Sequence, residues 1–176
     1  METPTNPPQL QKLVRSHKNL VATGGGSKRA LSRAPKGSLQ VSVAQLKGIV
    51  SYRPAELTLT AGAATSLQQI QGELDEHGQY LPFDPPFAQT GATLGGTVAA
   101  GVSGPGAYRF GSVGEFLLDI EYVNSSGELL RFSERSAEAE FPTYMIGSRG
   151  RFGLLTELTL KVLPCPPKSA TLIFEC

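Results

Sequence analysis

The chain has 176 residues, of which 40% are hydrophobic and 18% are charged, and its formal net charge is +1. This length suits one domain or two small lobes that share a core. The near-neutral charge excludes binding driven by long-range attraction to nucleic acid or to an anionic membrane. The 20 glycines and 13 prolines are dispersed among apolar residues, which indicates a loop-rich globular fold rather than a disordered or collagen-like chain.

The N-terminal part predicts a helix, a strand and a glycine loop, in that order. After two prolines, Leu10, Leu13 and Val14 recur at the spacing of one helix face, which predicts a short amphipathic helix. The stretch NLVATGGGS, residues 19–27, then predicts a strand that ends in a loop with exposed backbone.

Two further strands and a second helix complete the first 80 residues. Apolar and β-branched residues at 49–52 and 57–60 flank the turn sequence RPAE and predict two joined strands. Ser66 is a suitable N-cap for a helix whose apolar residues recur at helical spacing, and Gly78 marks its end. These elements together predict a small α/β lobe.

The region after residue 80 predicts a mainly antiparallel lobe. Small residues in TGATLGGTVAAGVSG, residues 90–104, predict a short helix that can approach another backbone or a flat ligand closely. Alternating patterns on both sides of SSGE predict a hairpin with Gly127 in the turn. We further predict a short helix within 137–148, a long strand at 154–164 that Pro164 stops, and another strand at 169–176.

The sequence carries little side-chain chemistry. Cys165 and Cys176 have no C-x-x-C spacing and no histidine cluster beside them, so we expect free thiols in a reducing cytosol and no metal site. No apolar run suits a secretory signal or a transmembrane segment. His17 and His77 are interpreted as solvated surface residues.

The two glycine-rich loops are the strongest functional signal. TGGGSK, residues 23–28, combines glycines, a hydroxyl and a lysine, the character of an anion site built from backbone N–H groups. Neither loop has the spacing of a P-loop or of a Rossmann fingerprint, and each alone could be a tight turn or a place of close packing. Two such loops in a chain without other chemistry favour a bound cofactor that carries its own reactivity.

The order and spacing of these segments resemble the FAD-binding domain of the vanillyl-alcohol oxidase / p-cresol methylhydroxylase type. The resemblance rests on TGGGSK, then LPFDPP and TGATLGGTVAAGVSGPGAYRFGSVGEFLLDIEYVNSSGELLRF, then MIGSRGRFGLLTELTLKVLP, and it covers residues from about 20 to 167. The subgroup it resembles most is the FAD-binding subunit of bacterial glycolate oxidase. This resemblance implies an α+β fold with two subdomains and FAD between them.

The resemblance also implies where the subdomains lie. Residues 1–80 would form a small α/β lobe with parallel strands and the pyrophosphate loop, and residues 81–167 a mainly antiparallel lobe flanked by helices. Residues 168–176 would begin a cap domain or form a C-terminal tail.

The same resemblance implies a set of cofactor contacts and assigns no catalytic side chain. The first loop would hold the pyrophosphate through backbone amides and the Ser27 hydroxyl, the second loop would line the flavin and ribityl chain, and GLL would run past the adenosine half. The implied residues are Thr23, Gly24, Gly25, Gly26, Ser27, Lys28, Pro82, Thr90, Gly91, Ala92, Thr93, Gly95, Gly96, Gly101, Ser103, Gly104, Gly111, Ser112, Gly153, Leu154 and Leu155.

Two departures from the family pattern modify these expectations. Many relatives attach flavin covalently through a histidine in the first loop, whereas this chain has Ser27 and Lys28 there, so noncovalent FAD is expected. The segment SERSAEAEFPTYMIGS, residues 133–148, replaces one resembling KNVAGYDLSRLMVGS that faces the flavin in relatives. The flavin surroundings therefore depart from the family pattern in this region.

The resemblance implies the FAD-binding subunit or domain of a glycolate-oxidase-like flavoprotein oxidoreductase. It would take two electrons from a 2-hydroxy acid or a partner flavin and pass them to an iron–sulfur or other acceptor subunit. The substrate part would come from a cap domain or a partner subunit. The expected location is cytoplasmic, or peripheral at the inner membrane through partners.

Two alternatives stay open. The chain could be a non-catalytic scaffold or assembly subunit that keeps the fold, or a generic nucleotide-binding module for ADP-type ligands.

Overall fold

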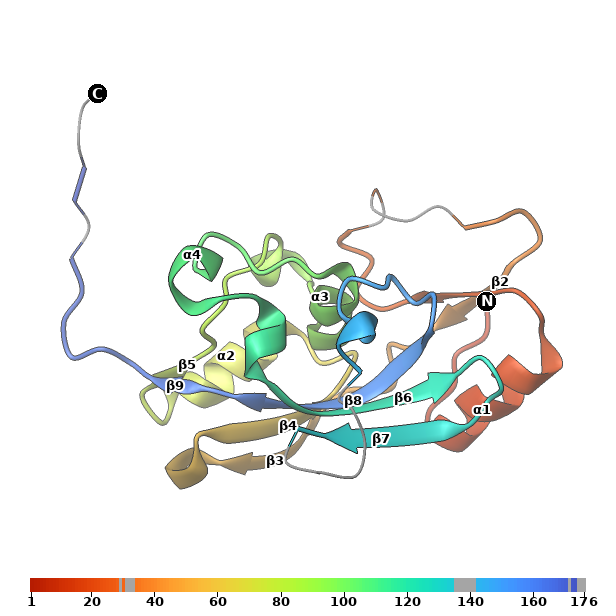
Figure 1. Ribbon diagram of the computed structural model, residues 1–176, viewed down its shortest axis with the longest axis horizontal. Helices are drawn as coiled ribbons and strands as arrows, with labels where there is room; N and C mark the ends of the chain where they lie inside the picture. The colour runs from red at the N-terminus through yellow and green to blue at the C-terminus, as the bar shows by residue number, and fades with distance from the viewer. Residues whose placement is uncertain (29, 31–33, 135–141, 171, 174–176) are drawn as a thin grey trace.

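The computed structural model describes residues 1–28, 30, 34–134, 142–170 and 172–173. Its largest element is a five-stranded sheet in the order β3-β4-β8-β6-β7, in which each neighbouring pair of strands is antiparallel. Helices α2 and α3 lie on one side of this sheet, and a separate parallel pair, β1 and β2, lies toward the same end as α1 (Figure 1). The predicted α+β class, with a parallel and an antiparallel part, is confirmed.

A short helix and the parallel strand pair build the smaller part of the fold. Helix α1, Pro7–Ser16, begins after Asn6, whose side chain accepts a hydrogen bond from the backbone N–H of Gln9 at 3.0 Å, a common cap of a first helical turn. Strands β1, Leu20–Thr23, and β2, Leu39–Ser42, pair in parallel. Apolar side chains of α1 and β2 bury against one another and against Val123 of the large sheet, so this second core joins the lobe to the sheet.

The large sheet is assembled from three separate stretches of chain. Its strands are β3, Ile49–Arg53; β4, Thr58–Gly62; β6, Leu117–Asn124; β7, Leu129–Ser133; and β8, Gly153–Lys161. As predicted, the turn between β6 and β7 contains Gly127, at a φ of +78°, a conformation that glycine adopts without steric cost. The last of these strands in the chain, β8, lies in the middle of the sheet, so the centre forms only when distant segments meet.

Two capped helices cover one face of the sheet. Helix α2, Leu67–Asp75, follows Ser66, whose hydroxyl accepts a hydrogen bond from the N–H of Gln69 at 3.1 Å, as predicted. Helix α3, Leu94–Ala100, follows Thr93, whose hydroxyl accepts from the N–H of Gly96 at 3.2 Å. The remaining short elements are η2, Pro54–Glu56; β5, Gln79–Tyr80; η3, Ala88–Thr90; α4, Ala107–Phe110; η4, Val113–Phe116; η5, Thr143–Met145; and β9, Leu163–Pro164.

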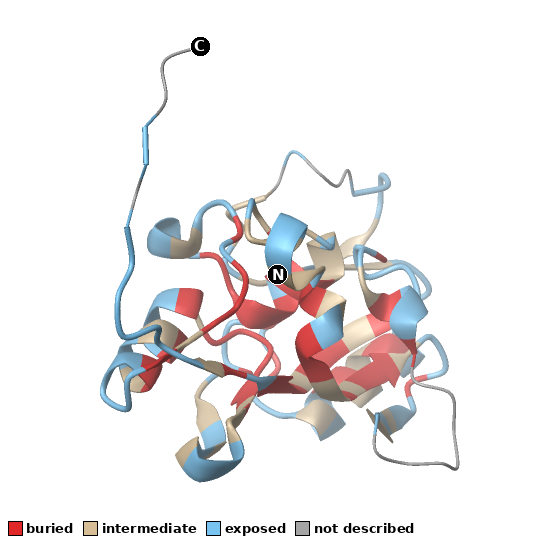
Figure 2. Cartoon of the chain, turned by 60° about the vertical axis from the view of Figure 1, so that its left-hand side comes forward, coloured by how far each residue is buried: buried red, intermediate tan, exposed pale blue. Residues whose placement is uncertain are grey.

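The main core lies between the sheet and helices α2 and α3 (Figure 2). Leu59, Ile120 and Leu158 of the sheet and Ile70 and Leu94 of the helices are all buried in it. Each side chain of this size contributes about 1.5–3 kcal/mol by leaving water. Because isolated helices this short are marginal in water, the packing holds them in place.

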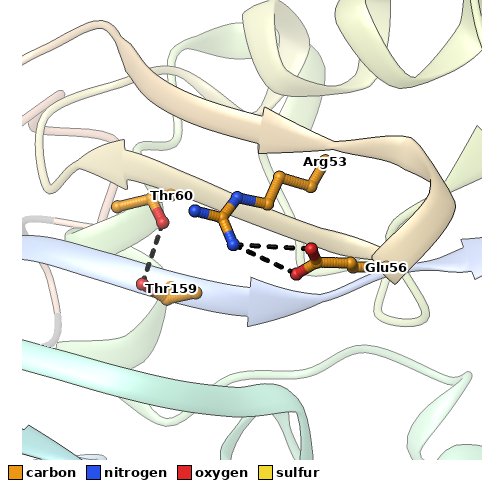
Figure 3. A network of polar contacts seen from close by, with 4 residues as sticks. All are labelled: Arg53, Glu56, Thr60 and Thr159. Atoms are coloured by element: carbon orange, nitrogen blue, oxygen red, sulfur yellow. Dashed lines mark hydrogen bonds and ion pairs between the residues drawn. The ribbon is translucent and has the colours of Figure 1, made fainter.

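The opposite face of the sheet carries polar side chains (Figure 3). The hydroxyls of Thr60 on β4 and Thr159 on β8 share a hydrogen bond of 3.0 Å, and Arg53 pairs with Glu56 at 3.3 Å at the end of β3. The Arg53 and Glu56 side chains are 65% and 54% exposed, so their ion pair adds little stability. Alternation along the strands thus separates the core face from this polar face.

Three of the predicted elements differ in the structure. The strand predicted at 154–164, with Pro164 as its end, already ends at Lys161. Leu163–Pro164 forms a separate short strand that pairs with β5. The strand predicted at 169–176 is wrong for its described residues, which form no strand; its apolar Leu172 is 75% exposed because no neighbouring strand edge pairs with it. The helix predicted within 137–148 lies partly outside the described residues, and Thr143–Met145 forms only a single 3-10 turn.

The large sheet joins segments from both sides of residue 80. Strand β4 precedes that residue but pairs with β8 of the later region, and β3 extends the sheet by pairing with β4. Strand pairing thus connects the chain before residue 80 with the chain after it. The subdomain limits 1–80, 81–167 and 168–176 stay a prediction.

Side chains of the reactive types are dispersed over the structure. His17, His77 and Cys165 are exposed, and Cys176 lies outside the described residues. Within the described ranges, no three His, Cys, Asp or Glu side chains gather where they could hold a metal ion. The described helices include none with the length and apolar character needed to cross a membrane.

Candidate functional site

An open cleft of about 990 Å³ lies between the parallel strand pair and helix α3. One wall consists of strand β1 and the glycine loop at residues 24–28. The facing wall consists of Ala63, the exposed side of α3, the turn at 148–151 and the first residues of β8. The cleft thus lies where the family resemblance implies the cofactor.

The glycine loop supplies a group of unpaired backbone donors. No described residue accepts a hydrogen bond from the backbone N–H groups of residues 24–28. A concave run of unpaired N–H groups forms an anion site. Residues 24 and 26–28 are half-buried at the cleft wall, so an anionic ligand there would satisfy these donors.

The two glycine-rich loops contact one another directly. A Cβ atom on Gly25 would overlap the backbone carbonyl oxygen of Gly91, and one on Gly24 would lie 2.9 Å from the Thr93 hydroxyl oxygen. Glycine is therefore required at Gly25 by the approach of two backbones, and its φ is not in the left-handed region. The contact fixes the position of the first loop relative to α3.

Helix α3 contributes shape to the cleft rather than free donors. Its first amides are already used: the N–H of Leu94 donates to the Thr65 carbonyl at 2.9 Å, and the N–H of Gly95 donates to the Ala63 carbonyl at 2.7 Å. Gly95 and Gly96 nonetheless line the cleft. They therefore offer a flat wall without side chains, while the first loop offers the hydrogen-bond donors.

The turn at 148–151 is held against the C-terminal end of α3. The N–H of Gly147 donates to the Val98 carbonyl at 2.9 Å, and the N–H of Arg149 donates to the Ala99 carbonyl at 2.8 Å. Arg149 has a φ of +55°, which is uncommon for a residue with a side chain. The hydrogen bonds hold this conformation, and Arg149 and Arg151 both line the cleft as a result.

The charges along the cleft are of one sign. Lys18, Lys28, Arg149 and Arg151 line it, and no aspartate or glutamate is among its described lining residues. Burial lowers the pKa of Lys28 below the usual lysine value, because desolvation disfavours the ammonium form. A bound anion would compensate that desolvation, so the electrostatics also favour an anionic ligand.

The structure brings together just over half of the residues predicted to contact the cofactor. Those that line the cleft are Thr23, Gly24, Gly25, Gly26, Ser27, Lys28, Thr93, Gly95, Gly96, Gly153, Leu154 and Leu155. They come from β1, the first loop, α3 and the start of β8, which are far apart in the sequence. Their contact with a cofactor stays a prediction.

The other predicted residues lie outside the cleft as the structure shows it. They are Pro82, Thr90, Gly91, Ala92, Gly101, Ser103, Gly104, Gly111 and Ser112. Several have protein partners: the buried Ser103 hydroxyl accepts a hydrogen bond from the Val113 N–H at 2.7 Å, and Ala92 is fully buried in the main core. For these residues too, a role toward the flavin stays a prediction.

Sequence reasoning missed several polar residues of the cleft. No motif marks these residues, which lie before or within the parallel strands: Lys18 and Asn19 precede β1, Ser38 precedes β2, and Gln40 lies on β2. Arg149 and Arg151 also line the cleft, and the glycines around them in GSRGRFG, residues 147–153, are typical of a tight turn. That turn is the signal that could have placed them beside the ligand.

Comparison with known proteins assigns the chain to a family. The sequence profile of the FAD binding domain matches residues 2–133. The chain belongs to this family. Its cofactor is accordingly FAD, and the cleft between the two lobes is the region to test for it.

Curated relatives of this FAD-binding chain include three enzymes or enzyme subunits. Glycolate oxidase subunit GlcE of Escherichia coli (strain K12) is 38% identical over 168 residues, which cover 93% of this chain and 48% of the relative. D-2-hydroxyglutarate dehydrogenase of Xanthomonas citri pv. viticola is 30% identical over 80% of this chain and 30% of the relative. D-lactate dehydrogenase of Anaerostipes hadrus is 28% identical over 78% of this chain and 29% of the relative. The chain thus spans about half the length of the first relative and under a third of the other two.

A solved structure shows the same fold. Alkyldihydroxyacetonephosphate synthase superposes with a TM-score of 0.77 at 21% identity, over 94% of this chain and 32% of that one. The likeness therefore covers nearly all of the FAD-binding chain but only a part of the larger protein.

The residues present fit an FAD molecule. The unpaired N–H groups at 24–28 and Lys28 are donors for the pyrophosphate. Leu154, Leu155 and the bare surface of α3 offer apolar walls. The volume of about 990 Å³ is at the upper end for small-molecule sites, roughly 300–1,000 Å³.

Proposed function

We propose that this chain is the FAD-binding part of a flavin-dependent oxidoreductase that acts on 2-hydroxy acids. The observation that supports this most directly is the cleft, which has unpaired amides at 24–28 and a cationic lining. The match of the chain to the profile of the FAD binding domain supports the same cofactor. When bound, FAD supplies the acceptor for the two electrons that leave a 2-hydroxy acid as it becomes a 2-oxo acid.

The chain's own residues bind and orient the cofactor. The amides of the first loop and the Lys28 ammonium hold the pyrophosphate, and the Gly25–Gly91 contact keeps those amides in place. Gly95 and Gly96 allow a flat ring system to approach α3 closely. Arg149 and Arg151 add positive charge on the facing wall.

The substrate class follows from the relatives. Glycolate, D-2-hydroxyglutarate and D-lactate, which the names of the relatives contain, are all 2-hydroxy carboxylates. None of the described cleft residues is a His, Asp, Glu, Cys or Tyr, and Lys28 is assigned to the pyrophosphate, so the base that takes the hydroxyl proton is assigned to none of them. We assign that group to another part of the protein or to a partner.

The binding of FAD is proposed to be noncovalent. Flavin attachment through protein requires a nucleophilic side chain such as histidine, and the described lining residues include neither His nor Cys. Acid precipitation of the loaded protein should leave the flavin in the supernatant. Flavin that stays with the precipitate would contradict this part of the proposal.

The partner is proposed to be another subunit of a glycolate-oxidase-like complex, with an iron–sulfur or similar acceptor receiving the electrons. The word subunit in the name of the relative at 38% identity supports an assembly. The chain alone should therefore bind FAD but fail to reduce a dye with glycolate or D-lactate. Turnover should require co-purified partner subunits.

A flavin titration tests the cofactor claim. Apoprotein is titrated with FAD and followed by flavin fluorescence and by the thermal unfolding midpoint. Lys28→Met should weaken FAD binding about tenfold, the loss of one charge-assisted contact. Lys12→Met, on the exposed face of α1 and away from the cleft, serves as the matched control and should leave binding unchanged.

The outcomes separate the proposal from its alternatives. Saturable FAD binding that Lys28→Met weakens, with turnover in the assembled complex, supports the proposal. FAD binding without turnover in any combination of subunits favours a non-catalytic scaffold. Preference for ADP or NAD over FAD favours a generic nucleotide module, and absence of any FAD binding overturns the proposal.

A further inference from the structure

Two side chains of helix α1 donate hydrogen bonds to one acceptor, the backbone carbonyl of Gly127 in the turn between β6 and β7 (Figure 1). The Gln11 side-chain amide and the Arg15 guanidinium each lie 2.9 Å from this oxygen. A Cβ atom on Gly127 would lie 2.5 Å from the Cγ of Arg15, so the close approach requires glycine at this position. Together these contacts clamp the helix to the turn.

The turn that supplies the carbonyl is itself held by several hydrogen bonds. The side-chain oxygen of Asn124 accepts from the N–H groups of Ser126 and Glu128, at 3.0 and 2.9 Å. The backbone carbonyl of Asn124 accepts from the N–H of Gly127 at 3.0 Å. Because Asn124 is the last residue of β6, which pairs with both β7 and β8, the turn has a fixed position on the large sheet.

Strand pairing does not join the lobe that carries the loop at 24–28 to the large sheet. Strands β1 and β2 form a sheet of their own, and the second core, which joins the lobe to the large sheet, is apolar. Apolar contacts are non-directional, so they hold two surfaces together without fixing their exact relative position. The hydrogen bonds to the Gly127 carbonyl are directional and supply that position.

The second core extends from α1 to the wall of the cleft. Leu10 and Val14 of α1 are buried in this core, and each is next to a clamping residue in the chain. Val43 and Leu154 belong to or pack against the same core, and both also line the cleft. A shift of α1 would therefore displace side chains of the cleft, because closely packed interiors transmit strain.

Helix α1 also leads directly to the loop at 24–28. Only residues 17–19 separate α1 from β1, and β1 ends where the loop begins. The contact between Gly25 and Gly91 fixes the loop end of this path. The clamp fixes the helix end, so both ends of β1 are positioned relative to the rest of the fold.

We propose that Gln11 and Arg15 are positioning residues for the cofactor: by clamping α1 to the Gly127 carbonyl, they hold the walls of the cleft at the separation that FAD requires. Neither residue is among the described lining residues of the cleft, so each acts through α1 and the second core without touching the ligand. The inference rests on the proposed function, because it concerns the binding of FAD in this cleft.

The double variant Gln11→Met/Arg15→Met tests the proposal, because it removes both donors and keeps unbranched stems on the helix. Loss of the clamp lowers the fraction of protein in the binding-competent arrangement, and the apparent Kd rises by the same factor. We expect the Kd for FAD to rise about tenfold. Either single variant should have a smaller effect, because one donor still holds the carbonyl. Titration of the apoprotein, followed by flavin fluorescence, measures the Kd.

A second measurement reports the position of α1 itself. Spin labels are attached at Lys12→Cys on α1 and Lys161→Cys at the end of β8, both exposed positions, in a Cys165→Ser/Cys176→Ser background. Pulsed electron paramagnetic resonance without FAD should give a broader or shifted distance distribution when the clamp is lost. A pair of residues that only added stability would leave this distance unchanged in the folded protein.

The matched control is Ile70→Val on α2. Ile70 is buried in the main core and is not among the described lining residues of the cleft. Loss of its methyl group destabilises the fold to a degree similar to loss of a hydrogen bond. The Kd for FAD and the distance between the labels should equal those of the parent.

The outcomes separate this inference from the proposed function. Weaker FAD binding and a changed distance in the double variant, with neither in Ile70→Val, support the inference. An unchanged Kd or an unchanged distance in the double variant overturns it and leaves the proposed function intact. An equal loss of affinity in Ile70→Val also overturns it, because the effect would then come from stability alone. A parent that binds no FAD overturns the proposed function and this inference with it.

Discussion

Replacing Gly25 by alanine should separate the two glycine-rich loops. The added Cβ would overlap the carbonyl oxygen of Gly91 and lie 3.2 Å from the Thr93 methyl carbon. The obstacle is backbone on one side, so it cannot rotate away as a flexible side chain would. The φ of Gly25 is outside the left-handed region, and the expected effect therefore comes from the collision rather than from backbone strain.

The size of the effect follows from overpacking. Inserting one methyl group into a tight contact costs about 1–3 kcal/mol. For a chain of this length the thermal midpoint falls by about 2–4 °C per kcal/mol, so Gly25→Ala should unfold roughly 2–12 °C below the parent. Because the same contact positions the amides at 24–28, the Kd for FAD should rise by about tenfold or more, equivalent to at least about 1.4 kcal/mol.

The matched control is Gly72→Ala on helix α2. A Cβ there would meet no atom within 4 Å, and alanine favours the helix over glycine by about 0.5–1 kcal/mol. This variant should unfold slightly above the parent and bind FAD unchanged. Circular dichroism gives the unfolding midpoint without cofactor, and flavin fluorescence gives the Kd. A Gly25→Ala protein with the parent's midpoint and Kd would refute the contact between the loops and the role assigned to it.

Three further predictions concern single side chains. Burial lowers the pKa of Lys28, so FAD affinity should fall as pH rises through that lowered pKa and the ammonium loses its proton. FAD titrations across a pH series should show this fall in the parent and not in Lys28→Met. The hydroxyls of buried Tyr122 and exposed Tyr144 share a hydrogen bond of 2.8 Å. Because Tyr144→Phe leaves the buried Tyr122 hydroxyl unpaired, it should lower the free energy of unfolding by about 1–3 kcal/mol, which is more than Tyr122→Phe should. Equal losses for the two variants in urea denaturation would contradict this. Burial is the main cause that raises the pKa of Glu157, against the opposing effect of Arg131; the folded state therefore binds the proton more tightly, and its stability is greatest below the unfolded pKa and declines as pH rises through the folded pKa. Glu157→Gln should remove this contribution and exceed the parent's urea midpoint at neutral pH, with the gap closing near pH ~4; a gap between variant and parent that does not widen as pH rises would show the sign to be wrong.

Predictions from the sequence succeeded where the signal is local. The cap at Ser66 lies within three residues of the amide that it binds, and the turn at Gly127 requires only its own backbone conformation. The strand predicted at 169–176 fails for the opposite reason: an alternating pattern becomes a strand only if another strand offers an edge, and the described residues there have none. The position of β8 between β4 and β6 likewise depends on partners far away in the chain.

The two glycine-rich loops of the sequence indicate an anionic cofactor, and the resemblance that their order and spacing carry implies FAD. The different roles of the two loops become visible only in the folded structure. The amides of α3 are consumed by the carbonyls of Ala63 and Thr65, so the donors left for phosphate are those at 24–28. The tertiary structure also decided that Arg149 enters the cleft, since the carbonyl of Ala99 holds its backbone in place. Hydrogen bonds and close approaches between distant segments produce no periodic pattern in a sequence, because they depend on the tertiary structure and not on the residues next to each partner.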